Sequence, residues 1–514
     1  MVHVKKKQRW TIPLLLLPLV SCAGKFVLEP YAYGKLEDTP FSFTQYKGYS
    51  RLGPYASFSS LDHPSFEASL QEIYSFGSAR KLLPSTGEQY LTVIPVDFRD
   101  YPYEGDYKTS IEAAFFGSSS SNQYVSLAEY YDKSSYHRLH VKGEVSEAFR
   151  CNETYATLKT KNNASQTKAA LTKIYQDAVA WYNGQSYGRT LGSDDAVYFV
   201  YSAPYSGMDG GTSSRSSMMW AFAVNDPAPI AWSSYYMMHP SSKGHVDAHT
   251  YIHEFGHLLG LKDYYDPNSY AELSPCSPLG RMDMMDCSLG EHNGFSKMLL
   301  NWAHPYVVEG ECEISLRPSS GNPDLVLLPL SGYNNTPYAE YVLLEFYTPT
   351  YLNDADATLR EQEEMRLFQS AGIKAYHVDG RLGVYEARGK SPWGLLTPST
   401  LIGNRSLDFY CDNSGSVSQG KASSSRGFLI QLLDASSRSM SLTANYIASD
   451  HIVDLPIGND VAHLRDSLYH VGQGIDESTE DTDLHGEKKL QYGFKVKEIT
   501  TTYATLSFFP LPQE

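Results

Sequence analysis

Residues 251–266 carry the residue types of a hydrolytic metal site, in the order YIHEFGHLLGLKDYYD. His253 and His257 are four residues apart, so on a helix both imidazoles project from one face. A catalytic zinc ion takes three protein ligands and leaves a fourth position for water. Asp263, which follows the second histidine after a short interval, can supply the third ligand. We therefore expect His253, His257 and Asp263 to bind one Zn²⁺.

Glu254 lies next to the first histidine, where it can act as a general base. Zinc lowers the pKa of a bound water to about 7 and polarises a carbonyl, which suits amide hydrolysis without a covalent intermediate. The alternative is a buried helix that contains two core histidines. Such a helix would bury Glu254 beside Phe255 and Leu258 without a partner, at a cost of several kcal/mol. The pattern therefore favours a metal site.

The local sequence also predicts how the third ligand is brought back to the histidines. A helix can start within Asp247–Thr250, and Gly260 is well placed to end it in the left-handed conformation. That ending turns the chain and allows Asp263 to return toward the imidazoles. A carboxylate in this position adds negative charge and should raise the pKa of the bound water. Asp266 is an alternative third ligand, or it orients one of the ligands.

The zinc motif resembles that of the immune inhibitor A family of metallopeptidases, which is related to the metzincins. Metzincins carry a methionine turn beneath the metal, and the sequence DMMD at Asp283–Asp286 lies where that turn should fall. Met285 looks like its methionine. Similar stretches upstream (YLTVIPVDFRD) and downstream (GEHNGFSKMLLNWAHP) extend the resemblance over roughly residues 85 to 310.

The resemblance implies a zinc-dependent metalloendopeptidase that cleaves extracellular proteins, with Glu254 as catalytic base. One position departs from the pattern. Several metzincin families place an oxyanion-stabilising tyrosine two residues after the turn methionine, and here that residue is Cys287, which leaves Tyr264 and Tyr265 as candidates. The alternative is a catalytically weak, peptidase-like surface module that binds peptide, glycan or host protein. A zinc-dependent deacylase of cell-wall components is a second alternative, which nothing outside the motif supports.

Other polar residues have ordinary interpretations beside functional ones. His249 can line the same helix face or act behind the ligands, and His292 can reach the cleft or lie in a loop. The residues His377, Asp379 and Glu345 can bind a second ion, but a hydrogen-bonded cluster is favoured. The acidic run at 476–483 indicates a solvated loop, with structural Ca²⁺ as the minor alternative.

The chain of 514 residues is too long for one compact core. Strands alternate with helices up to about residue 305, and short strand-like runs separated by turns follow. We expect an α+β protein in which a metzincin-like catalytic domain at 85–308 is followed by a β-sandwich-like domain at 309–514. Residues 22–84 are expected to form a tether, a cap or a pro-segment.

The N-terminus has the features of an export signal at 1–21. A basic run at Lys5–Arg9 precedes about eleven apolar residues, too few for a hydrocarbon core that needs roughly twenty. Leu19–Cys22 resembles a bacterial lipobox, in which Cys22 becomes the lipid-modified first residue. The mature protein is then anchored to the bacterial membrane from the outside without spanning it, or secreted if the lipobox is not used.

Charge and cysteine content limit the partners. A formal charge of −16 argues against nucleic acid but does not identify a substrate. The family resemblance implies a protein or peptide substrate, and lipid on Cys22 would make the membrane a second partner. Five cysteines remain after Cys22, namely Cys151, Cys276, Cys287, Cys312 and Cys411. They allow two disulfides and one thiol, or reduced and buried cysteines.

Overall fold

The computed structural model describes 49–51, 82–118, 125–206, 208, 217–238, 247–265, 278–286, 288–331, 333, 337–358, 367–386, 394–395, 405–411, 413, 428–436, 446–449, 453–457, 460–479, 483–484 and 488–513. The predictions of a signal peptide at 1–21 and of lipidation at Cys22 lie outside these residues. So do Asp266, Cys276 and Cys287.

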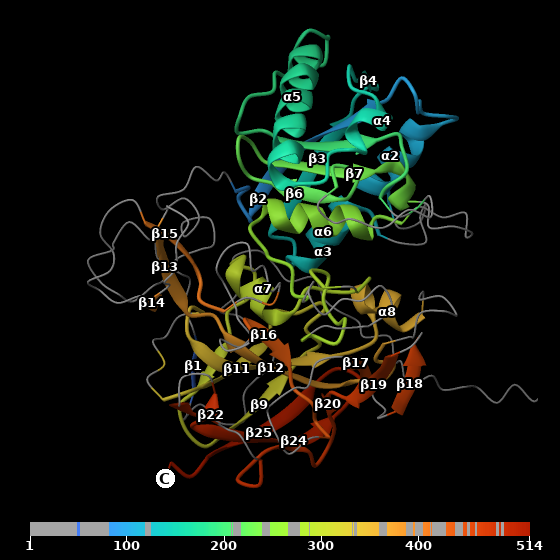
Figure 1. Ribbon diagram of the computed structural model, residues 1–514. Coiled ribbons are helices and arrows are strands. Elements are labelled where there is room, and N and C mark those ends of the chain that lie inside the picture. Colours follow the sequence, from blue (N-terminus) through green and yellow to red (C-terminus); the bar gives the residue numbers. More distant parts are fainter. Residues whose placement is uncertain are drawn as a thin grey trace, which may run out of the picture.

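The N-terminal part is built on a mixed sheet with the strand order β3-β2-β5-β7-β6, and β4 also pairs with β2 (Figure 1). Its strands are β2 (Gly87–Asp97), β3 (Leu139–Val145), β4 (Phe149–Arg150), β5 (Ala196–Tyr201), β6 (Phe222–Val224) and β7 (Ile230–Ser234). All pairings are parallel except that of β6, which runs antiparallel to β7 at the edge of the sheet. The apolar run SSMMWAFAV at 216–224 predicts a strand over its whole length, but residues 217–220 form a turn and the strand is confined to β6.

Helices cover both faces of this sheet. They are α2 (Tyr107–Phe116), α3 (Leu127–Ser134), α4 (Tyr155–Leu158), α5 (Ala164–Asn183) and α6 (His249–Leu258), with the 3-10 turn η2 at Tyr235–Met238. Alternate residues of β5 serve the two sides, because Val197 and Phe199 belong to the core under α5 whereas Tyr198 and Val200 belong to the core under α6. The sheet thus presents α6 on the face opposite α5.

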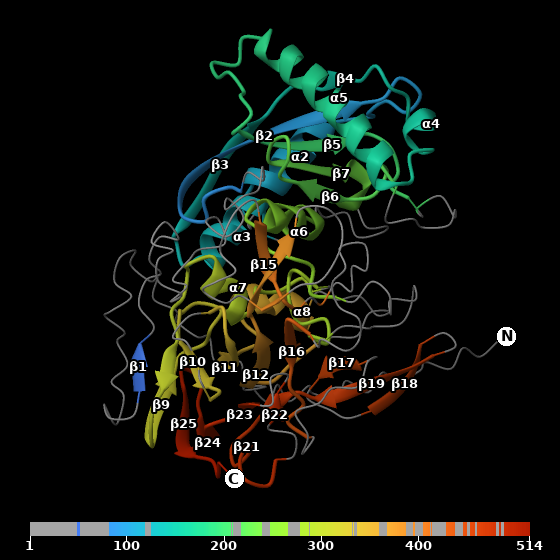
Figure 2. The ribbon, with the colours of Figure 1, turned by 60° about the vertical axis from the view of Figure 1, so that its left-hand side comes forward.

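The C-terminal part is dominated by strands (Figure 2). Its largest sheet contains β1 (Tyr49–Arg51), β8 (Tyr306–Val308), β10 (Leu325–Pro329), β11 (Glu340–Tyr347), β12 (Gly372–Asp379), β16 (Ile430–Leu432) and β20 (Leu468–Tyr469). A second sheet has the order β21-β24-β25-β9, with bounds Gly474–Ile475, Tyr492–Ile499, Ala504–Pro510 and Cys312–Leu316.

Smaller elements complete this part. They are α7 (Gly294–Leu299), η3 (Tyr351–Asn353), α8 (Asp354–Thr358), β13 (Leu382–Glu386), β14 (Gly394–Leu395), β15 (Arg405–Phe409), β17 (Tyr446–Ser449), β18 (Val453–Ile457), β19 (Asp460–Asp466), β22 (Asp483–Leu484) and β23 (Lys488–Lys489). The stretch FKVKEITTTYATLSFF predicts two strands, and these are present as the antiparallel pair β24 and β25.

The two parts share one apolar core. The cluster under α6, which includes Ile252 and Phe255, continues without a break into Leu325 and Leu343 of the large C-terminal sheet. The fold class is mixed α+β, as expected. The sandwich-like character of residues 309–514 and the boundary at 308 stay predictions. Within the residues the structure describes, no helix has the length and apolar character needed to cross a membrane.

Candidate metal centre

Helix α6 begins at His249, within the predicted start region, and is fixed by buried contacts. Its core face contains Tyr251, Ile252 and Phe255, which are fully buried. The Tyr251 hydroxyl donates to the carbonyl of Ser234 (2.9 Å), and the Tyr131 hydroxyl of α3 donates to the carbonyl of Ile252 (2.7 Å). These bonds join α6 to the sheet on one side and to α3 on the other, so the helix carries its polar face in a set direction.

Gly260 ends α6 as predicted. Its φ is +102°, a value that favours glycine, and the N–H of Leu261 donates to the carbonyl of Gly256 (3.0 Å). The N–H of Gly260 donates to the carbonyl of His257 (3.0 Å). This pair of bonds is the Schellman ending of a helix. It reverses the chain over one turn, and Asp263 therefore returns to the level of the histidines.

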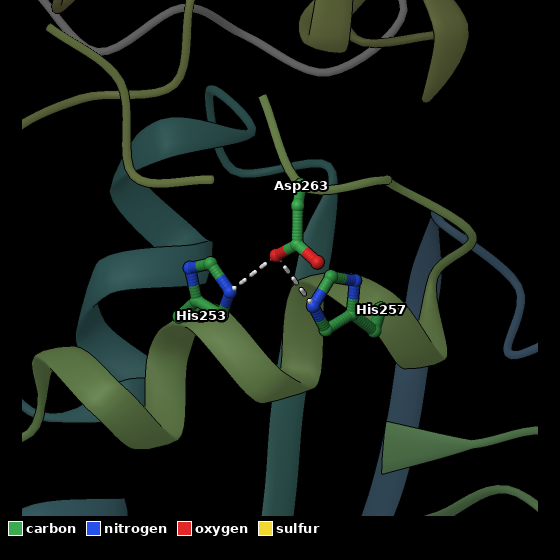
Figure 3. A group of neighbouring side chains, drawn as sticks. All are labelled: His253, His257 and Asp263. Atoms are coloured by element: carbon green, nitrogen blue, oxygen red, sulfur yellow. Dashed lines mark hydrogen bonds and ion pairs between the residues drawn. The ribbon is translucent and has the colours of Figure 1, made fainter. Parts of the chain in front are cut away.

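The structure brings His253, His257 and Asp263 together (Figure 3). The Oδ1 atom of Asp263 lies 3.0 Å from Nε2 of His253 and 3.3 Å from Nε2 of His257. One ligand atom from each residue lies within 4.8 Å of the others. Two imidazole nitrogens and a carboxylate oxygen are the donor set that zinc takes in catalytic sites. The three side chains therefore fit the predicted ion.

The remaining nitrogen of each imidazole is held by a backbone carbonyl. Nδ1 of His253 lies 2.8 Å from the carbonyl oxygen of Met284, and Nδ1 of His257 lies 2.8 Å from that of Leu261. A carbonyl can only accept, so each Nδ1 carries the proton and donates it. In a neutral ring this leaves the lone pair on Nε2, which faces Asp263. The backbone thus selects the tautomer that a metal ion requires.

The charges in this group are strongly coupled. Burial would raise the pKa of Asp263, but His257 and His253 together lower it well below its usual value. Burial would lower the pKa of His257, but the Asp263 carboxylate raises it to about 9. The group therefore attracts positive charge. A divalent cation would compete for the same place with the protons of the imidazoles, because metal ligation requires neutral histidine.

Glu254 is buried on the same helix, with 5% of its surface exposed. Burial raises the pKa of Glu254, and the two neighbouring histidines oppose that rise. Among the described residues, its Oε2 has no hydrogen-bond partner. An unpaired buried carboxylate is costly for a purely structural helix, but a general base needs an oxygen that is available to a proton.

The methionine turn lies directly beneath α6. A Cβ atom built on Gly256 would approach the sulfur of Met285 to 2.6 Å, so Met285 packs against the helix backbone between the two histidines. The turn is closed by Asp283, whose carboxylate accepts the N–H groups of Met285 and Asn293 (each 2.6 Å). The carbonyl of Met284 holds His253, as described above. The turn therefore supports a ligand as well as the helix.

The other histidines considered from the sequence do not belong to the group of three candidate ligands. His249 pairs with Asp247 (Nδ1–Oδ1 2.7 Å) and is half exposed. His292 lies in the irregular segment before α7, as its interpretation as a loop residue predicts, but its side chain is buried with rings of Tyr130, Tyr131 and Trp302 around it. Of the methionine-turn cysteine Cys287 nothing is described.

The two oxyanion candidates differ sharply. Tyr264 is fully buried and its hydroxyl lies 2.8 Å from the hydroxyl of Ser296, so it faces the core. Tyr265 is partly buried, and its ring lies nearly parallel to that of His253 at a centroid distance of 6.5 Å. The ring of Tyr265 thus lies beside the imidazole of a metal-binding candidate, whereas the hydroxyl of Tyr264 is directed to Ser296.

The suggested second ion site is not assembled. Nε2 of His377 pairs with Glu340 (3.0 Å), Asp379 pairs with Arg381 (2.6 Å), and Glu345 accepts the hydroxyl of Tyr376 (2.8 Å). The favoured interpretation as a hydrogen-bonded cluster therefore agrees with the contacts. In the described part of the acidic run, Asp476 accepts the N–H of Ser478 in a turn. Cys151, Cys312 and Cys411 are buried thiols.

Two supporting residues were not foreseen from the sequence. Tyr131 holds the carbonyl of Ile252, and the side chain of Asn225, directly after β6, donates to the carbonyl of His257 (3.0 Å). Both contacts join segments that are far apart in the sequence, and neither residue belongs to a local motif. An aromatic residue in an amphipathic helix is the sole signal that Tyr131 gives, and that signal indicates burial rather than a partner.

Comparison with known protein families and with curated proteins yields no match for this chain, either to a family model or to a single protein. The functional interpretation therefore depends on the residues of the centre and on their geometry.

Proposed function

We propose that the protein is a zinc-dependent metalloendopeptidase with a metzincin-like catalytic domain. The observation that carries the proposal is the convergence of His253, His257 and Asp263 beside the buried Glu254 of α6, whose Oε2 has no hydrogen-bond partner among the residues that the structure describes. Three ligands of this type leave a coordination position for water, which distinguishes a catalytic zinc site from a structural one.

When bound, zinc would supply a water of lowered pKa and a Lewis acid for the scissile carbonyl. Glu254 takes the proton of the attacking water on Oε2 and returns it to the nitrogen of the leaving amine. The Met284 and Leu261 carbonyls keep both imidazoles in the tautomer with a lone pair on Nε2. Tyr265, whose partly buried ring lies beside His253, is the residue that we assign to steady the oxyanion through its hydroxyl, because the position two residues after Met285 is Cys287.

The proposal includes the setting in which the enzyme acts. Export through the signal at 1–21 and lipid attachment at Cys22 would place the catalytic centre outside the cytoplasm, on the bacterial cell membrane. The substrates would then be extracellular proteins or peptides. This part of the proposal rests on the amino-acid sequence of the N-terminus. N-terminal sequencing and mass analysis of the mature protein test it.

The experiment that tests the activity compares wild type with Glu254→Gln on the chain from Ala23 onward. Zinc content is measured together with cleavage of a mixed peptide library, with and without a chelator. We expect zinc in both proteins and a loss of cleavage of at least about a hundredfold in Glu254→Gln, because a general base contributes that much or more. Asp247→Asn, which removes a carboxylate at the start of α6, is the matched control and should retain cleavage.

Three results would contradict the proposal. Normal turnover in Glu254→Gln would exclude the assigned base. Zinc without cleavage in wild type, also after trimming of residues 23–48, which precede β1, would favour the peptide- or glycan-binding module. Absence of zinc would remove the centre itself.

A further inference from the structure

The third metal ligand lies on a segment with no regular structure. Residues 260–265 follow α6 and belong to neither a helix nor a strand. In the described part of the chain, the carboxylate of Asp263 bonds to His253 and His257 alone. A metal-binding carboxylate usually has further partners that orient it. The orientation of Asp263 must therefore come from its two chain neighbours, Lys262 and Tyr264.

Lys262 is held by the C-terminal half of the molecule. Its Nζ lies 2.5 Å from Oδ1 of Asp408 on β15, and both side chains are largely buried. The same ammonium group lies 5.7 Å from the ring centroid of Phe409. Asp408 is itself fixed, because its Oδ1 accepts the N–H of Phe409 (2.8 Å). The ion pair thus connects the residue before Asp263 to a strand that is remote in the sequence.

Tyr264 is held from the same side. Nδ2 of Asn413 donates to the carbonyl of Tyr264 (3.0 Å) and to the carbonyl of Ile430 (2.6 Å). Oδ1 of Asn413 accepts the N–H of Ile430 (3.1 Å). The Asn413 side chain is 1% exposed and thereby joins Tyr264 to β16, a strand of the large C-terminal sheet.

Tyr264 is also bound by the methionine turn. Its N–H donates to the carbonyl of Met285 (2.8 Å), and its hydroxyl lies against Ser296. Both backbone groups of Tyr264 are therefore bound, one by the turn and the other by Asn413. With Lys262 also anchored, the backbone on each side of Asp263 is fixed, and the carboxylate points at the two imidazoles.

We propose that Asp408 and Asn413 are positioning residues of the metal centre, through which the C-terminal β region holds Asp263 in place and sets the affinity for zinc. The inference rests on the proposed zinc site and goes beyond it. Asp408 has a second effect, because its carboxylate balances the Lys262 ammonium group. Without that balance, a positive charge next to Asp263 would oppose the binding of a divalent cation.

The test measures the zinc dissociation constant of the full mature chain by competition with a chromophoric chelator. Wild type is compared with Asp408→Asn and Asn413→Ala. The matched controls are Asp324→Asn, which breaks the buried Arg317–Asp324 pair, and Asn322→Ala, which removes a buried amide bonded to the carbonyl of Pro318. Both controls perturb the C-terminal half at contacts that do not involve residues 260–265.

We expect the dissociation constant to rise about 10- to 100-fold in each of the two test variants and to stay unchanged in the controls. The visible spectrum of the cobalt-substituted protein should change in the test variants alone, since a merely structural role would not alter the ligand field. In a Lys262→Met background, the further effect of Asp408→Asn should be small, because the two residues act as a pair.

An unchanged dissociation constant in Asp408→Asn and Asn413→Ala, with tight zinc binding in wild type, would overturn the inference and leave the zinc site intact. If Asn413→Ala does not fold, Asp408→Asn decides by itself. Tight zinc binding without peptide cleavage would contradict the peptidase but leave the expected loss of affinity in place. Failure of wild type to bind zinc would overturn both proposals.

Discussion

Helix α6 and the segment 260–265 both carry metal-binding candidates, but they are held in different ways. The helix places His253 and His257 by its own periodicity and by apolar contacts of its buried face. The segment places Asp263 through bonds of its neighbours to Asp408, Asn413 and the methionine turn. The former arrangement is local, and the latter depends on the folded C-terminal half.

This difference indicates how the centre can be assembled. The helix can be formed once the N-terminal sheet and α3 are in place, because Tyr131 and Ser234 belong to that part. Asp263 is held through residues of and near β15 and β16. The proposed centre would therefore be complete only in a chain in which both parts are folded, and the C-terminal region would contribute to metal binding through Asp408 and Asn413.

Removal of a candidate histidine ligand or of the candidate aspartate ligand should have the largest effect on zinc affinity. His253→Ala and Asp263→Ala should each weaken zinc binding by more than the roughly hundredfold effect expected for outer partners. His253→Ala should lower the free energy of unfolding of the metal-free protein by only about 1–3 kcal/mol, because it removes two hydrogen bonds, to Met284 and to Asp263, from a helix held by other contacts. Chelator competition and thermal unfolding measure the two quantities.

One outcome would break the comparison. If Asp263→Ala keeps its zinc affinity within about tenfold of wild type, then Asp263 is not the third ligand, and the segment 260–265 has no part in the centre. His249→Ala is the control, because its ring pairs with Asp247 and does not belong to the group of three candidate ligands.

Gly260→Ala tests the helix ending that connects α6 to the segment 260–265. An alanine at a φ of +102° is strained, so we expect a loss of about 1–3 kcal/mol in the free energy of unfolding. Because the strained turn also determines where Asp263 returns, zinc affinity should fall as well. Gly188→Ala, at a φ of +56° in a loop of the N-terminal part, is the control. It should cost stability without a change in zinc affinity.

If Gly260→Ala lowers stability but leaves zinc affinity at the wild-type value, the anchors at Lys262 and Tyr264 are sufficient by themselves. The helix ending would then be a consequence of the position of Asp263 rather than its cause.

The sequence was sufficient for the parts of the centre that depend on local rules. The i, i+4 spacing placed both histidines on one face, and Gly260 predicted the reversal that returns Asp263. The strands of the buried sheet were also visible as apolar runs. The helix α5 was missed, although Asn163 caps it and its buried residues Leu171, Ile174, Tyr175, Ala178 and Tyr182 follow a helical period.

The contacts that depend on the tertiary fold could not be predicted. Asp408 and Asn413 lie about 145 and 150 residues beyond Asp263, in a stretch whose strands are short and whose pairing no local pattern determines. His292 illustrates the same limit. Its type and its position after the methionine turn suggest a polar role, yet long-range packing places it among three aromatic rings.

The smallest expected effect on stability concerns His292, which packs against Tyr131, the residue that bonds to α6. Burial lowers its pKa well below the ordinary value of 6.5, and Lys297 adds to that shift. In the unfolded chain the ring binds a proton below pH 6.5, whereas in the folded chain it stays neutral, so acid favours unfolding. The free energy of unfolding should fall by up to about 1.4 kcal/mol per pH unit as the pH drops below this value.

The measurement is the unfolding midpoint in denaturant between pH 7 and pH 5 for wild type and His292→Phe. The phenylalanine ring has no proton to bind, so the pH dependence of the variant should be flatter. His140→Phe, at an exposed position, is the control for the exchange of a histidine for a phenylalanine as such. Since His292 packs against Tyr131, which holds α6, a protonated His292 would loosen the helix while the anchors of Asp263 stay intact. An equal pH dependence in wild type and His292→Phe would show that His292 can bind a proton in the folded protein at little cost. The aromatic contacts between His292, Tyr131 and α6 would then hold the helix less firmly than their burial implies.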